Sequence, residues 1–222
     1  MHCRSALSLA LLCSTAVAQP PATNSNLSSS NLTSPLTIVI RSDAPAPPRV
    51  LSAMEREVES LTAATGIRTN WVTEKGSVGV FEQLAVVTLH GACSPNAPIP
   101  ISVWTHRGQA QPLGQTQVVD GQVLPFADVR CDPIRQLISR ELNRQPGQGR
   151  EDLLGRAMGR VLAHELYHIV LRSTSHGHDG LAREAQSSSD LTAERDDFSP
   201  SDERKLSQSV AGDDSESPGA GR

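Results

Sequence analysis

Aromatic residues are scarce in this chain, and neither sign of charge dominates it. Only six of its 222 residues are aromatic (two Trp, one Tyr and three Phe), so the core must be built from Val, Leu, Ile and Ala. The formal net charge at pH 7 is −4, and residues 190–222 alone carry nine acidic and four basic side chains. The rest of the chain is close to neutral and lacks the basic footprint of a nucleic-acid-binding protein, so we expect no nucleic-acid partner.

Long apolar runs are also missing. No stretch approaches the roughly 20 apolar residues that a membrane-spanning helix needs. Residues 1–18 instead read as a signal peptide, with a short basic start, a weakly apolar middle and an A-x-A cleavage site at Ala16-Val17-Ala18. The sequence therefore predicts a secreted or periplasmic protein without a membrane span. Lipidation at Cys13 or a retained anchor is the alternative, although Leu12 stands where lipoproteins carry a small residue.

Cysteine is rare as well, with four residues in all. Removal of the signal peptide takes away Cys3 and Cys13 and leaves Cys93 and Cys131. In an exported protein such a remaining pair most simply forms a disulfide, which would stabilise the fold by about 4 kcal/mol in the chain-entropy model. Zinc-binding thiolates are the alternative, but neither cysteine lies in a C-x-x-C pair. We therefore predict a disulfide.

Composition divides the chain into four parts. After the signal peptide, residues 19–35 are rich in Ser, Asn and Pro and are expected to form a disordered leader. Residues 36–195 hold the apolar patterns of one folded domain. Residues 196–222 are polar and acidic, and we expect them to form a disordered tail that can be removed without loss of stability.

Apolar periodicity within residues 36–195 predicts an α+β fold. Asp120-Gly121 marks a two-residue hairpin turn, and Pro47-Pro48 and Asp132-Pro133 indicate helix starts. The expected strands span residues 36–40, 67–72, 84–91, 115–119 and 122–129, and the expected helices span residues 47–61, 132–142 and 150–173. This order predicts helices packed against a small mixed sheet, with one long helix near the end of the domain.

Histidine is crowded into one short segment. Four of the seven histidines lie within residues 164–178, and His164, Glu165 and His168 form an H-E-x-x-H motif. Residues four apart share a helix face, so both imidazoles can bind one Zn²⁺ ion while Glu165 accepts a proton from the zinc-bound water. The helix is apolar on most faces, and burying these groups without a partner would cost several kcal/mol. We therefore predict a zinc site rather than two hydrogen-bonded core histidines.

The third zinc ligand is less closely specified by the sequence. Catalytic zinc usually takes three protein ligands and a water. His176 lies eight residues beyond His168, in the turn expected after the helix, and we predict that it swings back to the metal. Three alternatives remain open, namely His178, Glu184 and Glu194.

The H-E-x-x-H helix, preceded by a hairpin, resembles the active-site region of the zincin metallopeptidases. The motif matches, and the order of strands and helices over residues 36–176 matches more loosely. The metzincin pattern H-E-x-x-H-x-x-G-x-x-H is not kept, because Leu171 occupies the glycine position and Thr174 the third histidine position. No methionine follows Met158 to form the metzincin Met-turn, and LAREAQ (181–186) is a weak version of the glutamate helix of thermolysin-like enzymes. The resemblance is to a divergent zincin of neither group.

This resemblance implies an exported, zinc-dependent metallopeptidase with a zincin-like active-site helix. Zn²⁺ would be its cofactor, a peptide or protein its substrate, and Glu165 the base that activates the zinc-bound water. The alternative is a catalytically inactive zincin-fold protein that binds a partner or carries a metal. A purely structural site needs no general base, so Glu165 favours catalysis.

Other residues have expected supporting roles. An exposed edge strand would bind an extended peptide by strand addition, and LAVVTLHG (84–91) or VLPFADV (123–129) is expected to supply it. His178 or Arg183 is the expected donor to the developing oxyanion. Tyr167 lies about 100° from His168 around the helix and should face away from the metal as a packing residue.

Overall fold

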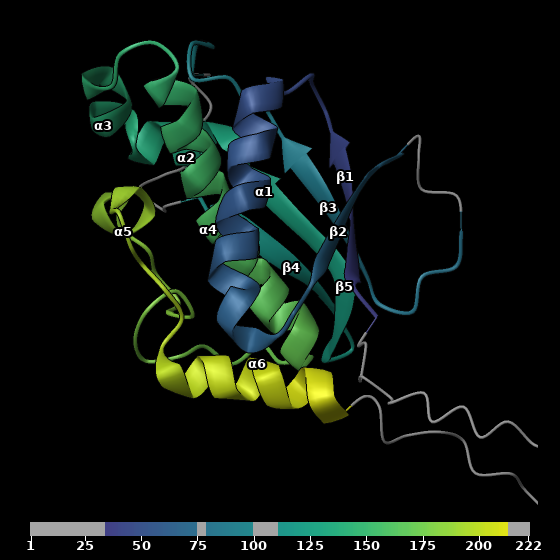
Figure 1. The fold of residues 1–222 in the computed structure, drawn as a ribbon. Helices are drawn as coiled ribbons and strands as arrows, with labels where there is room; N and C mark the ends of the chain where they lie inside the picture. Colours follow the sequence, from purple (N-terminus) through teal and green to yellow (C-terminus); the bar gives the residue numbers. More distant parts are fainter. Residues whose placement is uncertain (1–33, 75–78, 100–110, 213–222) are drawn as a thin grey trace, which may run out of the picture. The chain divides into compact units, whose positions relative to one another are not determined.

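The computed structural model describes residues 34–74, 79–99 and 111–212 (Figure 1). The predicted signal peptide, nearly all of the predicted leader and residues 213–222 lie outside this part of the chain. The described residues form a mixed sheet with helices packed on it, which confirms the predicted α+β class. None of the described helices is both long and apolar enough to cross a membrane.

Five strands form one sheet in the order β2-β1-β3-β5-β4. They span Leu36–Ser42 (β1), Thr69–Thr73 (β2), Leu84–His90 (β3), Gly114–Val119 (β4) and Gln122–Arg130 (β5). β1 is parallel to β2 and β3, β3 is parallel to β5, and β4 alone runs antiparallel to its neighbour. Asp120 and Gly121 form the predicted turn between β4 and β5, with positive φ angles of 51° and 78°. Two positive φ angles are what a tight hairpin turn of this twist requires.

The edge strand differs from the prediction. β3 lies between β1 and β5, and β5 lies between β3 and β4, so neither LAVVTLHG nor VLPFADV has a free edge. The two ends of the described sheet are β2 and β4, and β4 is the hairpin strand that takes the edge position. The physical reason is burial: β5 places Ala127 and Val129 in the core, whereas no residue of β4 is fully buried. The more apolar strand of the hairpin therefore pairs inward.

The helices span Pro48–Thr62 (α1), Cys131–Leu137 (α2), Ser139–Arg144 (α3), Gly149–Leu171 (α4), Ser188–Thr192 (α5) and Pro200–Gly212 (α6), with a 3-10 turn at Ala63–Thr65 (η1). The second predicted helix is divided into α2 and α3 at Ile138. α1 and α4 approach closely because Gly155 and Gly159 lack side chains. A Cβ on Gly155 would lie 2.5 Å from Ala53 Cβ, and one on Gly159 would lie 2.7 Å from Glu57 Cβ.

The core between these helices and the sheet is almost entirely aliphatic. The buried residues of β3 are Ala85, Val87 and Leu89, which alternate along the strand and belong to the same buried cluster as the apolar residues of α1 and α4. Tyr167 and Phe198 are the aromatic residues of that cluster among the described residues, and their rings stack with centroids 5.8 Å apart. The aliphatic core expected from the composition is confirmed.

The C-terminal segment corrects the prediction of a disordered tail from residue 196. Residues 200–212 form α6, which contacts α4 and lies across its C-terminal end in Figure 1. Phe198, Asp202 and Leu206 stand four residues apart and are 4%, 1% and 1% exposed. These three form a single buried stripe. The polar composition of the segment conceals it, because only one residue in four faces the core.

The predicted disulfide is present between Cys93 and Cys131. It joins the segment after β3 to the first residue of α2, and both cysteines are buried. The bond closes a loop over a sequence separation of 38 residues. Closing a loop of this length restricts the unfolded chain and contributes about 4 kcal/mol in the chain-entropy model.

Candidate metal centre

The H-E-x-x-H motif lies in the last turns of α4, with its histidines on one buried face. His164 is 9% exposed and His168 is 6% exposed. Their rings are 4.9 Å apart between centroids, and the two Nε2 atoms are 3.2 Å apart. Helical spacing brings the pair together, because residues four apart lie on the same face of a helix.

Backbone carbonyls determine the tautomer of both rings. His164 Nδ1 lies 2.9 Å from the carbonyl oxygen of Leu181, and His168 Nδ1 lies 2.8 Å from that of Ser173. A carbonyl oxygen can only accept, so each Nδ1 carries the proton and each Nε2 keeps a lone pair. Burial lowers the pKa of both histidines, which holds them neutral near pH 7.

Two lone pairs therefore face each other across 3.2 Å, and neither nitrogen can donate a hydrogen bond to the other. A cation between them removes this repulsion. Zinc–nitrogen distances of about 2.0–2.1 Å in a tetrahedral site place two ligand nitrogens about 3.3 Å apart. Histidine ligands of zinc commonly donate their second N–H to a carbonyl, as both do here. The donor set fits a zinc ion.

His176 joins this pair from the loop after α4. Its ring lies 5.3 Å from the His164 ring and 4.7 Å from the His168 ring, measured between centroids. One ligand atom from each of the three residues lies within 4.8 Å of the others. Within the described ranges this is the one group of three such donors, and it does not include the alternatives His178, Glu184 and Glu194. The geometry favours His176, and its ligand role remains a prediction.

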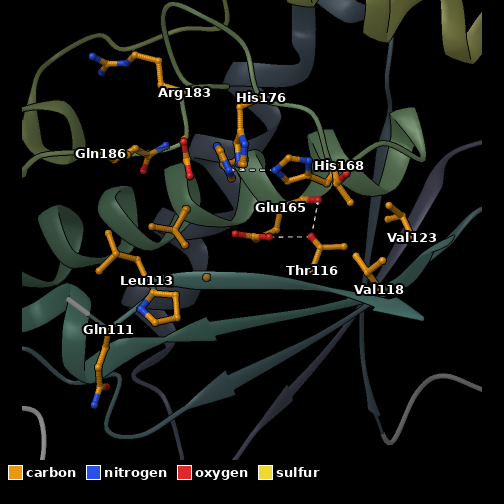
Figure 2. Close-up of a pocket in the computed structure, with 17 residues that line it drawn as sticks. Gln111, Leu113, Thr116, Val118, Val123, Glu165, His168, His176, Arg183 and Gln186 are labelled. Carbon is orange, nitrogen blue, oxygen red and sulfur yellow. Dashed lines mark hydrogen bonds between the residues drawn. The ribbon is translucent and has the colours of Figure 1, made fainter. Parts of the chain in front are cut away.

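Glu165 is held against the edge strand rather than pointing at the histidines. Its side chain is 6% exposed, and Thr116 of β4 donates its hydroxyl to Glu165 Oε2 at 2.7 Å (Figure 2, dashed line). Gly114 lies against the other oxygen, because a Cβ there would be 2.5 Å from Glu165 Oε1. Burial raises the pKa of Glu165, and the hydrogen bond from Thr116 only partly offsets that effect. The carboxylate is therefore more basic than an exposed glutamate.

A cavity of about 470 Å³ opens between β4 and the motif face of α4. Gly114, Thr116 and Val118 line it from the strand, and residues 183–186 line it from the loop beyond His176. Figure 2 shows Thr116 beneath Glu165, with His168 and His176 together above it. The candidate metal ligands, the carboxylate and the edge of β4 thus border one space.

The structure does not support the two expected oxyanion donors. Arg183 lines the cavity, but its guanidinium pairs with Asp190 at 3.1 Å and donates to the Gly180 carbonyl at 3.0 Å. Figure 2 shows its guanidinium directed away from His176. His178 is exposed and does not line the cavity. Tyr167, by contrast, packs as expected, because its ring stacks on Phe198 outside the cavity.

Sequence reasoning missed the contributions of β4 and of the loop carbonyls. Thr116 sits within the alternating segment QTQVV, where nothing local distinguishes it from the other polar residues. Gly114 precedes the strand that was expected to begin at Gln115. Both become parts of the site only because β4, like β5, packs against α4.

Comparison with known proteins gives one remote likeness. The chain matches no protein-family model, and no curated protein matches it in sequence. Its fold is similar to the crystal structure of archaemetzincin from Methanopyrus kandleri, with a TM-score of 0.47 and 13% sequence identity, covering 80% of this chain and 96% of that chain. A likeness of this strength carries no functional argument.

Proposed function

We propose that this protein is a zinc-dependent peptidase that acts outside the cytoplasm. The observation that carries the proposal is the paired Nε2 lone pairs of His164 and His168, 3.2 Å apart and beside a buried glutamate. His176 would complete the three ligands that catalytic zinc usually takes, and its place in the same cluster supports this. The buried disulfide is compatible with an oxidising compartment such as the periplasm or the extracellular space.

The three histidines would hold the metal, and Glu165 would accept the proton and then donate it. When bound, zinc acts as a Lewis acid that polarises a carbonyl group and lowers the pKa of water. Glu165 follows His164 directly and borders the same cavity. Its raised pKa makes it more basic than an exposed glutamate, which suits a general base that takes up a proton and passes it to a leaving amine. Thr116 fixes the orientation of that carboxylate through its hydroxyl.

The edge of β4 would bind the substrate. An extended peptide that pairs with β4 would lie along the cavity and cross the position of Glu165. Val118 and its cross-strand partner Val123 also line this cavity, and Val118 is 44% exposed. This valine pair, with Val118 exposed and Val123 half-buried, offers an apolar contact to one side chain of that peptide. This supports an unstructured peptide as the substrate class.

The decisive experiment compares wild-type protein with Glu165→Gln, using the chain from Gln19 onward with its disulfide intact. Glutamine keeps the size of the side chain but cannot accept the proton. We expect Glu165→Gln to fold and to bind one equivalent of zinc. It should cleave an unstructured peptide library about 10²–10⁴-fold more slowly than wild type. Chelation should abolish wild-type cleavage, and added zinc should restore it.

Three results would separate the alternatives. Wild-type protein that binds zinc but cleaves nothing in the library supports the metal-carrying function and contradicts the peptidase. Equal cleavage by wild type and Glu165→Gln places the activity outside this site. Protein that binds no zinc contradicts the metal centre itself.

A further inference from the structure

Asp202, in the first turn of α6, is a buried carboxylate that lies outside the cavity. Its Oδ1 accepts hydrogen bonds from the Tyr167 hydroxyl at 3.1 Å and from Lys205 Nζ at 2.8 Å, and its Oδ2 accepts from Ser199 Oγ at 2.7 Å. Burial opposes ionisation, but these three hydrogen bonds outweigh it and lower the pKa of Asp202. A charged group is thus kept in the interior by contacts that satisfy it.

The same carboxylate contacts the loop that carries His176. A Cβ on Gly177 would lie 2.6 Å from Asp202 Oδ2, so the glycine lets the loop backbone rest directly on the carboxylate. Gly177 immediately follows His176. Tyr167, which donates to the other oxygen, immediately precedes His168. Asp202 therefore contacts the chain neighbours of two of the three histidines.

The residues just before α6 also support His164. Leu181 donates its backbone N–H to the carbonyl of Asp197 at 3.1 Å, and Gly180 forms a β-bridge with Phe198. The carbonyl of that same Leu181 accepts from His164 Nδ1. Residues 197–202 thus dock onto the loop at Leu181, the residue whose carbonyl orients His164, and at the glycine beside His176.

His176 needs such support, because the segment it stands on has neither helix nor strand. Residues 173–177 have no regular secondary structure, and His176 itself is exposed. A ligand on an irregular segment is held in place only by what that segment packs against. For this segment that includes Asp202 at Gly177 and the Ala182 carbonyl, which accepts the Gly177 N–H at 2.8 Å.

We propose that Asp202 is a positioning residue of the metal centre, which holds His176 within reach of an ion bound by His164 and His168. The inference rests on the proposed metal site. It assigns α6 a role in metal binding, although α6 contributes no ligand.

Metal affinity tests this role in the full mature chain. Zinc affinity would be measured by competition with a chromogenic chelator, and coordination geometry by the visible spectrum of the cobalt(II)-substituted protein. We expect Asp202→Asn to weaken zinc binding about 10–100-fold and to alter the cobalt bands while the protein stays folded. Leu206→Ala is the matched control, because Leu206 is equally buried on α6 but its aliphatic side chain cannot accept the hydrogen bonds that Asp202 accepts from Tyr167 and Ser199. It should lower the melting temperature without changing the affinity of the folded protein.

A double-mutant cycle with His176→Ala shows whether Asp202 acts through that ligand. If it does, Asp202→Asn costs little further affinity once His176 is gone. Should Asp202→Asn not fold, Tyr167→Phe and Gly177→Ala probe the same contacts singly, and each should weaken zinc binding.

Unchanged zinc affinity and cobalt bands in these variants would overturn the inference, and so would fully additive losses in the cycle. Equal losses in Leu206→Ala would assign the effect to general destabilisation and reject it as well. Wild-type protein that binds neither metal would instead remove the proposed function, together with this role for Asp202.

Discussion

At the scale of single residues, the site depends on which histidine nitrogens carry protons. Hydrogen bonds to the carbonyls of Leu181 and Ser173 leave a lone pair on Nε2 of His164 and of His168 for the proposed metal. These carbonyls belong to the loop after α4, so the loop orients two of the proposed ligands and carries the third. This arrangement explains how a helix motif and an irregular segment act as one centre.

The third ligand can be tested against a neighbour only two residues away. We expect His176→Ala to weaken zinc binding by at least about tenfold, because it removes one of three ligand atoms that lie together. His178→Ala is the matched control, since His178 is exposed and outside the cluster, and it should bind zinc like wild type. Chelator competition measures both. A greater loss in His178→Ala would transfer the ligand role to that residue.

At the scale of elements, two segments of largely polar sequence, β4 and α6, support α4. β4 holds Glu165 through Thr116, and α6 packs against α4 with Leu206 in the core. Neither element is strongly apolar. Each is defined by a few side chains that face α4.

Truncation distinguishes α6 from the residues that follow it. A chain that ends at Phe198 loses the buried side chains of Asp202 and Leu206, and burying a leucine alone is worth about 2 kcal/mol or more. We expect its melting temperature to fall by several degrees or more, with weaker zinc binding. A chain that ends at Gly212 keeps all of α6 and should melt like the full-length protein. Thermal unfolding followed by circular dichroism makes the comparison, and identical curves for both truncations would show that α6 adds no stability.

At the scale of the whole molecule, an ion-pair bridge links three parallel strands at one end of the sheet. His90, the last residue of β3, lies 2.9 Å from Asp43 after β1 and 3.0 Å from Asp128 of β5. The hydrogen bond with Asp128 is the main cause of a raised pKa at His90, and Asp43 adds to it. The protonated form of His90 therefore favours the folded state.

This bridge predicts a pH dependence with a definite sign. Because the pKa is raised on folding, the contribution is fully present below the unfolded histidine pKa of about 6.5, and it is lost as pH rises through the folded value. The side chain is 41% exposed, so the effect should be under about 1 kcal/mol. We expect wild type to be more stable than His90→Gln at pH 5.5 and the difference to shrink at pH 8.5. Urea unfolding at both pH values measures it, and a difference that grows with pH would contradict the assignment.

Several features follow from the sequence alone because they depend on short-range geometry or on elimination. His164 and His168 share a face of α4 since a helix repeats every 3.6 residues. Asp120-Gly121 forms the hairpin turn since both positions accept a positive φ. Cys93 and Cys131 pair in the structure, as expected from their being the two cysteines that lie outside the predicted signal peptide. Each of these can be read without knowing which elements meet.

Tertiary structure alone decided the rest, because those features depend on which distant segments pack together. The edge role of β4 follows from β5 pairing inward with β3, and Thr116 reaches Glu165 only in that arrangement. The order in α6 comes from burying Asp202 and Leu206 against partners far away in the sequence. His176 lies beside the other histidines because its loop rests on Asp202 and Leu181 joins it to residue 197. Local sequence patterns do not specify such contacts, because the free energy that favours them is gained only when the whole domain has assembled.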